Sequence, residues 1–236
     1  MLGRMFTILH RDEHLVAIDK PPGALVHRTP TTRQGHIVLQ GLRDQLGRRV
    51  WPVHRLDRAT SGVLLLALDA ETASALAREF KERRVEKTYL ALVRGWPAEK
   101  GLIDHPVHSG EHKNPEKRKE AVTRYRRLAK AELPVAVDRY PTSRYALMEA
   151  RPLTGRYQQL RQHFKKISHP IIGDTTWGDG KHNRFFRERY GVHRLMLHAL
   201  RLAFTHPISG EPVAVEAPVD DQWRDLFREF GWKPRP

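Results

Sequence analysis

The feature that most constrains the fold of this chain is an uninterrupted apolar run, VLLLAL, at positions 63–68. Successive side chains of a strand point to opposite faces of a sheet, so such a run predicts a strand that is covered on both sides. The run is short for a helix and far too short to cross a membrane. We therefore expect a central, buried strand on which the rest of a layered domain is built.

The periodicity of apolar residues elsewhere predicts more strands than helices, and the two are not regularly interleaved. This pattern favours an α+β fold, with a mixed, largely antiparallel sheet flanked by helices, over a doubly wound fold. The length of 236 residues fits one large domain or one domain with an appendage. The polar, turn-rich stretch 100–121 is predicted to be a mobile, solvated loop. The predicted strands lie at 14–23, 63–68, 88–95, 143–152, 197–204 and 213–218, and the predicted helices at 36–47, 70–84, 158–167 and 220–232.

The charge balance indicates the kind of partner. The chain has 42 Lys and Arg against 27 Asp and Glu, a formal net charge of +15. Such an excess favours a polyanionic partner, most often nucleic acid, although a solubilising basic surface is the plain alternative. An anionic membrane surface is disfavoured because the basic residues are spread along the chain. There is no apolar membrane span, no signal-peptide core and no cysteine, which together favour a cytoplasmic protein.

The stretch HRLDRATSG at 54–62 leads directly into the predicted central strand. Its carboxylate, Asp57, is therefore expected at the edge of the core, where burial alone would favour the neutral acid and a nearby guanidinium would keep it ionised. A carboxylate held charged in a dry site can act as a nucleophile or a base. The competing interpretation is a plain turn in which Asp57, Thr60 and Ser61 satisfy backbone donors. From these nine residues alone, the turn is the stronger interpretation.

Five motifs in a fixed order favour the chemical interpretation of Asp57 over the plain turn. The first, HRLDRATSG, resembles the His-Arg-Leu-Asp-x-x-Thr-Ser-Gly motif of the RluA-type pseudouridine synthases. The other four are DKPPG with VHR (19–28), EKTYLALVRG (86–95), TGRYQQLRQHF with SHPIIGDTTWG (154–178), and RLMLHALRLAFTHPISGE (194–211). They are similar to segments of the same family in the same order and cover nearly the whole chain. Within the family, RYPTSRYALME (139–149) and the FREFGW tail most resemble the tRNA pseudouridine-65 synthase branch.

The resemblance implies an isomerase that breaks the N1–C1′ bond of a uridine in RNA, turns the uracil, and joins C5 to C1′. It implies no cofactor and no metal, and a single pseudouridine synthase catalytic domain without an N-terminal RNA-binding domain of the S4 type. The expected partner is tRNA, with a uridine of the T stem at position 65 as target. We expect a monomer with no membrane and no protein partner.

Three residues fall on the family's catalytic positions. Asp57 matches the essential aspartate, for which both a nucleophilic and a glycal route remain open. Tyr89 matches the active-site tyrosine, and strand alternation would place it on one face with Ala91 and Val93, although a core aromatic is the competing interpretation. Arg161 matches the arginine that pairs with the catalytic carboxylate, whereas as a bare helix residue it would be a solvated charge.

Further residues are expected to contact the RNA. Arg55 matches the arginine that enters the RNA at the vacated base position, or it is a phosphate clamp or plain surface charge. His54, Arg156 and Lys165 complete the expected RNA-binding set. Leu197 is a candidate apolar wall against the base, and a core role fits it equally well.

One residue departs from the family. Gln158 stands where the family has His, and a Gln cannot exchange protons near neutral pH. We expect the function to be preserved if that position only makes hydrogen bonds.

Three other classes compete with this interpretation. A glycoside hydrolase needs a second carboxylate at a defined separation, and none is evident near the motif. A metal-dependent nuclease would draw on the 14 histidines, but there is no His-Glu-x-x-His run. A non-catalytic RNA-binding protein explains the charge but not the combination of Asp57, Tyr89 and Arg161. An rRNA substrate of the same chemistry also stays open.

Overall fold

The computed structural model describes residues 5–28, 37–110 and 118–233, and it divides into two compact units. Unit 1 comprises Met1–Lys87 and His198–Pro218, and unit 2 comprises Thr88–Leu197 and Val219–Pro236. Each unit is described by itself. The first residue of the helix predicted at 36–47 and part of the loop predicted at 100–121 lie outside the described residues.

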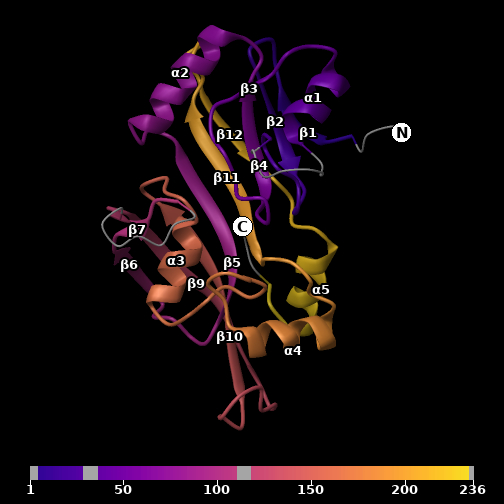
Figure 1. Ribbon diagram of the computed structural model, residues 1–236, viewed down its shortest axis with the longest axis vertical. Helices are drawn as coiled ribbons and strands as arrows, with labels where there is room; N and C mark the ends of the chain where they lie inside the picture. Colours follow the sequence, from indigo (N-terminus) through magenta and orange to yellow (C-terminus); the bar gives the residue numbers. More distant parts are fainter. Residues whose placement is uncertain (1–4, 29–36, 111–117, 234–236) are drawn as a thin grey trace. The chain divides into compact units, whose positions relative to one another are not determined.

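Unit 1 is built on a mixed sheet whose central strand is the one predicted from the apolar run (Figure 1). Its strands are β1 (Thr7–Arg11), β2 (Leu15–Lys20), β3 (Trp51–Pro52), β4 (Ser61–Ala67), β11 (Leu197–Thr205) and β12 (Pro212–Glu216). β2 and β3 both pair antiparallel with β4, β11 pairs parallel with it, and β1 and β12 extend the sheet antiparallel on β2 and β11. Every residue of β4 is buried, as the prediction of a strand covered on both sides requires.

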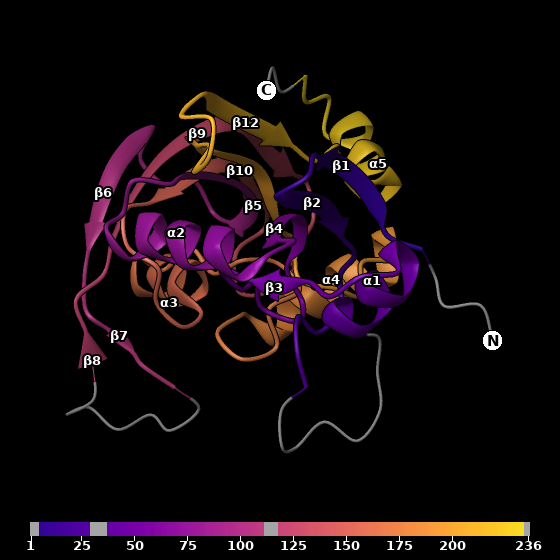
Figure 2. The same cartoon turned by 90° about the horizontal axis from the view of Figure 1, so that it is seen from above.

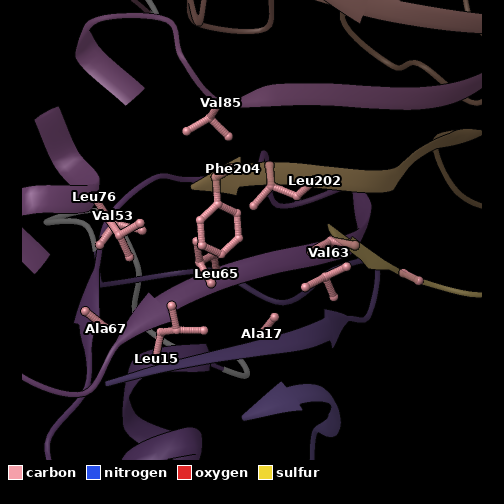
Figure 3. Close-up of a cluster of buried hydrophobic side chains, with 12 residues drawn as sticks. Leu15, Ala17, Val53, Val63, Leu65, Ala67, Leu76, Val85, Leu202 and Phe204 are labelled. Atoms are coloured by element: carbon pink, nitrogen blue, oxygen red, sulfur yellow. The ribbon is translucent and has the colours of Figure 1, made fainter. Parts of the chain in front are cut away.

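A hydrophobic core packs on the strands of unit 1 (Figure 3). The helix α2 (Ala70–Lys81) contributes Leu76 to it, and Asp69 caps this helix by accepting a hydrogen bond from the Thr72 amide at 2.7 Å. The helix α1 (Val38–Leu46) ends at Gly47 in the left-handed conformation that glycine adopts without strain. The buried residues of the core are Leu15, Ala17, Val53, Val63, Leu65, Ala67, Leu76, Val85, Leu202, Phe204, Val215 and Ala217.

Unit 2 is built on four antiparallel strands in the order β5 (Glu86–Arg94), β10 (Ser143–Pro152), β9 (Val122–Leu133), β6 (Lys100–Asp104). β9 and β10 form the long hairpin labelled in Figure 1. A separate short ribbon joins β7 (Val107–His108) to β8 (Arg118–Lys119), seen at the lower left of Figure 2. The helices of this unit are α3 (Gln159–Lys166), α4 (Gly180–Tyr190) and α5 (Asp221–Glu229).

The fold-class prediction is confirmed: strands outnumber helices, and all the strand pairs named above are antiparallel except β4 with β11. A single catalytic domain over 1–236 stays a prediction. No helix in the described part of the chain is both long and apolar enough to cross a membrane.

The prediction of a loop over 100–121 is wrong at Lys100–Asp104, Val107–His108 and Arg118–Lys119, which are strands. β6 occupies Lys100–Asp104 and pairs with β9, and its own residue Ile103 is buried. β7 and β8 form the short ribbon. The polar sequence concealed these strands because an edge strand needs few apolar residues when its backbone is paired on one side.

Candidate active site

The Asp57 loop is a short turn at the entrance to β4. The Thr60 amide donates to the Asp57 carbonyl at 3.1 Å, and the Asp57 side chain is half-buried. Gly62 has a φ of +107°, and a Cβ there would collide with the carbonyl oxygen of Ala199 on the neighbouring strand. Only glycine lets the two backbones approach this closely, so the small residues after Asp57 fit the turn onto the parallel pair β4–β11.

A buried histidine holds the far side of the same turn. His198 Nδ1 lies 2.9 Å from the Ser61 hydroxyl oxygen, and His198 Nε2 lies 3.1 Å from the Ala217 carbonyl oxygen. Because a carbonyl only accepts, Nε2 carries the proton and Nδ1 accepts from Ser61. Both side chains are buried. The residues after Asp57 are thus fixed by backbone fit and by this hydrogen-bonded chain.

Lys20, at the end of β2, ties the Asp57 loop to the turn that follows β2. Its side chain is fully buried, and Nζ donates to the carbonyls of Pro21, Ala24 and Arg58 at 2.9, 2.8 and 3.1 Å. The three acceptors match the three N–H groups of an ammonium. The Gly23 amide also donates to the Arg58 carbonyl at 2.8 Å, and Arg58 Nε donates back to the Gly23 carbonyl at 3.1 Å. Five hydrogen bonds therefore join or brace two loops that are distant in the sequence.

Lys20 also places a positive charge near the carboxylate. Burial lowers the pKa of Lys20 to about 7, while the negative charges of Asp57 and Asp19 act in the opposite direction. The same attraction favours an ionised carboxylate in the neighbourhood of the ammonium. Sequence reasoning missed this residue, because a lysine next to a turn is most often solvated. Its position in the DKPPG motif was the one available signal.

In unit 2, α3 carries Arg161 into a buried ion pair. Arg161 Nε and Nη2 donate to Oδ2 and Oδ1 of Asp174, each at 2.8 Å, and both side chains are almost entirely buried. Asp174 Oδ1 also accepts the backbone amides of Thr176 and Trp177 at 2.9 Å each. The arginine is thereby fixed in orientation. The interpretation of Arg161 as a solvated helix charge is wrong, and Asp174 is a second residue that sequence reasoning missed.

Two further buried polar side chains of α3 are held by partners on β9 and in the connection between β6 and β7. Gln159 Nε2 donates to the Val122 carbonyl at 3.0 Å and to the Thr123 hydroxyl at 2.9 Å. His163 bonds the Thr123 hydroxyl and the His105 carbonyl, each at 2.9 Å. Because these polar side chains have hydrogen-bond partners, α3 can be buried around most of its circumference despite its polar sequence.

Gln158 precedes α3 in a left-handed conformation with φ 47°. Its side-chain carbonyl accepts from Trp177 Nε1 at 2.8 Å, and its amide donates to the Tyr157 hydroxyl at 3.0 Å. The ring of Trp177 stacks against His108 at a centroid distance of 5.9 Å. Gln158 therefore acts in this structure as a hydrogen-bonding bridge to the Trp177 loop.

Residues 14–166 match the RNA pseudouridylate synthase family. The chain belongs to this family. It is 50% identical over 97% of its length to the tRNA pseudouridine synthase C of Pectobacterium carotovorum, of which it spans 63%. It is 48% identical to the tRNA pseudouridine synthase C of Vibrio cholerae, with 97% of each chain covered. The RluA-type resemblance is thereby confirmed, and with it an enzyme of the isomerase class.

Solved structures of pseudouridylate synthases have the same fold. Human RNA Pseudouridylate Synthase Domain Containing 1 is 25% identical, with a TM-score of 0.72 and 100% of this chain covered. Human RNA Pseudouridylate Synthase Domain Containing 4 has a TM-score of 0.76 at 24% identity, covering 97% of this chain. The family and the fold therefore agree.

Two further residues of the predicted site, Tyr89 and Leu197, lie on regular strands. Tyr89 is half-buried on β5, opposite Ala150 of β10, and alternation places it on the same face as Ala91 and Val93. Leu197, at the start of β11, is 3% exposed, so it has the burial of a core residue. Asp57 and Arg161 belong to different units, and their pairing stays a prediction.

The predicted RNA contacts differ in their surroundings. Arg55 and Lys165 are exposed, and Arg156 is half-buried with Nε donating to the Glu120 carbonyl at 3.1 Å. His54 instead packs inward: its ring stacks on Phe80 at 4.6 Å, and Nε2 accepts the Leu65 amide at 3.0 Å. Burial, with the nearby charge of Lys87, lowers the pKa of His54 to about 3.

A neutral His54 cannot contribute positive charge to phosphate binding. Its position in the structure therefore gives it a packing role, and its contact with RNA stays a prediction. Among residues 5–28, 37–110 and 118–233, no group of three or more His, Cys, Asp or Glu is arranged to hold a metal ion.

Proposed function

We propose that this pseudouridylate synthase acts on tRNA, isomerising one uridine of the T stem, position 65, to pseudouridine. The observation that carries the chemistry is the braced Asp57 loop, with a half-buried carboxylate near the fully buried Lys20. The tRNA substrate is supported by relatives named tRNA pseudouridine synthase C, which are 44–50% identical over 95–97% of the chain.

The reaction is an internal rearrangement. The N1–C1′ bond breaks, the uracil turns, C5 bonds to C1′, and the C5 proton is lost while N1 regains one, so atoms balance without a co-reactant. In the nucleophilic route Asp57 attacks C1′ or the base, and in the glycal route it removes a sugar proton. Both routes require an ionised, oriented carboxylate, which is what the Lys20 contacts favour.

Tyr89 and Arg161 complete the proposed chemistry from unit 2. The half-buried Tyr89 ring would pack against the uracil, and its hydroxyl would reach a sugar or base proton. Arg161 would pair with the carboxylate of Asp57 while Asp174 fixes its orientation. A buried pair of this kind contributes geometry and ionisation more than net stability.

A uridine in a stem is paired and stacked, so it must leave the helix before its glycosidic bond can be reached. This flipping costs a few kcal/mol, and Arg55, which is exposed, would fill the vacated position. The A-form groove hides base edges, so recognition should depend on shape, phosphates and 2′-hydroxyls. The net charge of +15 suits such a substrate. We propose a cytoplasmic monomer that needs no cofactor or metal.

The test is to incubate the protein with unmodified tRNA and rRNA transcripts and to map pseudouridine at nucleotide resolution. We expect one modified uridine in the T stem of tRNA. Signal confined to rRNA would overturn the tRNA substrate and spare the chemistry, and no signal in either RNA would overturn the chemistry as well.

A further inference from the structure

Unit 1 contains a pocket of about 590 Å³ whose residues none of the proposed chemistry uses. Its lining residues come from α1 and the residue before it, from the two residues before β3, and from His27 and Arg28. Ligand pockets in proteins commonly have volumes of about 300–1,000 Å³. The residues that line the pocket are His27, Arg28, Ile37, Leu39, Gln40, Arg43, Arg49 and Val50.

The lining combines an apolar floor with a basic rim. Val50 is buried and both Ile37 and Leu39 are half-buried, whereas Arg28, Arg43 and Arg49 are exposed. An apolar surface can pack against the flat face of a base. Guanidinium groups bind phosphate oxygens through paired N–H donors. The two kinds of surface together match the two halves of a nucleotide.

The arginines of the rim are already partly oriented. The guanidinium of Arg49 lies over the ring of Trp51, 4.9 Å from its centroid. Arg28 Nη2 donates to Gln40 Oε1 at 3.3 Å, and Arg43 pairs with the exposed Asp44 at 2.7 Å. A surface pair of this kind is weak, so a phosphate can compete for Arg43 at little cost.

Backbone hydrogen bonds connect the floor of the pocket to the Asp57 loop. The Val38 and Leu39 amides donate to the carbonyls of Leu25 and Val26 at 2.8 and 3.1 Å. Two residues earlier, Gly23 is bonded in both directions to Arg58, the residue after Asp57. A ligand in the pocket is therefore held at a fixed place relative to the catalytic loop, inside one unit.

We propose that this pocket binds one nucleotide of the RNA substrate other than the uridine that is isomerised, with its base on the Leu39 side and its phosphate on the rim arginines. This inference rests on the proposed function, since it assumes an RNA substrate. The pocket then fixes the register of the RNA against Asp57. Loss of this pocket should weaken RNA binding, while the rate of pseudouridine formation in the bound complex should stay nearly unchanged.

The chain has no cysteine, so a single introduced thiol can be labelled uniquely. The experiment introduces Leu39→Cys, attaches a photoactivatable benzophenone maleimide, and irradiates the complex with unmodified tRNA transcript. Ala77→Cys, on an exposed position of α2 in the same unit, is the matched control. We expect the Leu39 label to crosslink to one nucleotide that is not the isomerised uridine, at a yield several-fold above the Ala77 label.

Equal crosslinking from both labels, or no crosslinking from Leu39, overturns the proposal. Crosslinking only to the isomerised uridine also overturns it, because the pocket would then belong to the catalytic site. These failures are distinguishable from failure of the proposed function, since the unlabelled protein would still form pseudouridine.

Salt dependence provides a second measurement that needs no label. Each phosphate contact contributes roughly 0.7–0.9 to the slope of log affinity against log salt. The combined change Arg43→Gln and Arg49→Gln should lower the slope for tRNA by about 1.5. Arg78→Gln, on an exposed face of α2, should leave the slope unchanged. A slope unaffected by the double change contradicts phosphate binding at the rim.

Discussion

The guanidinium of Arg161 holds the carboxylate of Asp174 through two parallel hydrogen bonds of 2.8 Å, with both side chains almost fully buried. The backbone amides of Thr176 and Trp177 bind the same carboxylate, so the loop after α3 is fixed to the helix through one acidic side chain. Asp174 therefore sets the direction in which Arg161 presents its guanidinium.

Removing the charge of Asp174 should strongly destabilise the protein. Asp174→Asn leaves Arg161 buried without its anion, and breaking a buried pair costs about 3–5 kcal/mol in free energy of unfolding. Asp221→Asn is the matched control, because Asp221 pairs with Arg224 on the surface and is 90% exposed. Urea unfolding measures both variants. A change within about 0.5 kcal/mol for Asp174→Asn would show that the pair does not hold this loop.

Lys20→Met should reduce turnover while leaving RNA binding largely intact. The change removes the Lys20 hydrogen bond to Arg58 in the Asp57 loop, the two that brace the turn after β2, and a positive charge near the carboxylate. We expect kcat to fall at least tenfold with a small change in KM, because Lys20 acts on the position of Asp57. Lys81→Met, at an exposed position of α2, serves as control.

The stability of the Lys20 variant separates positioning from unfolding. Lys20→Met removes a group whose pKa is about 7 in the folded protein, against an ordinary value of 10.5 for a solvated lysine. Between these values the unfolded chain binds more protons, so wild-type stability rises with pH and the variant lacks this rise. A variant that is folded by circular dichroism and retains wild-type kcat would refute a positioning role.

Gly62 and Gly23 separate two reasons for glycine: a positive φ alone at Gly23, and a positive φ together with close backbone approach at Gly62. Both have positive φ, +107° and +86°, but a Cβ at Gly62 would strike the backbone of Ala199, and one at Gly23 meets nothing within 4 Å. Gly23→Ala should cost roughly 1–2 kcal/mol of backbone strain. Gly62→Ala should cost clearly more, because the parallel pair β4–β11 must separate. Thermal unfolding compares them, and equal losses would argue against close approach as the reason for Gly62.

Because of His54, the free energy of unfolding should depend on pH in a direction that follows from its lowered pKa. Its pKa is lowered from 6.5 to about 3 by burial, with a smaller contribution from Lys87. Between pH 6.5 and 3 the unfolded chain binds a proton that the folded chain does not, so stability is full above 6.5 and falls as the pH drops towards 3. His54→Gln keeps an acceptor for the Leu65 amide and does not titrate. The difference in unfolding free energy between the two proteins should shrink steadily across this range, and a constant difference would contradict a neutral, inward-packed His54.

The sequence predicted those elements whose own residues determine them. The apolar run became β4, the stretch 143–152 became β10, and the amphipathic pattern at 70–84 became α2. The elements that the sequence did not predict are those that form through contacts with segments far along the chain. β9 has the sequence of a charged segment, VTRYRRLAKAEL, because only Thr123 is buried and its other side chains are intermediate or exposed, while its backbone pairs with β6 and β10. α4 was missed for a similar reason, since GKHNRFFRERY buries only His182 and Phe186.

The residues of the candidate site also fall into those that the sequence predicted and those that it did not. Asp57, Tyr89 and Arg161 were found because the residues match family motifs, not because their surroundings could be inferred. Lys20 and Asp174 were not singled out, since their importance depends on contacts with Arg58 and Arg161 that no local pattern reveals. Burial of a charged side chain is a property of the fold, and sequence periodicity places such residues on the surface by default.

The role of Asp57 is decided by comparing the wild-type protein with Asp57→Ala on unmodified tRNA transcript, with pseudouridine measured by nucleotide-resolution mapping and affinity by filter binding. We expect the variant to bind tRNA within about threefold of wild type, roughly 0.65 kcal/mol at 25 °C, and to form no pseudouridine. Pseudouridine formed by Asp57→Ala at the wild-type rate would contradict the assignment of Asp57 as the group that carries the chemistry.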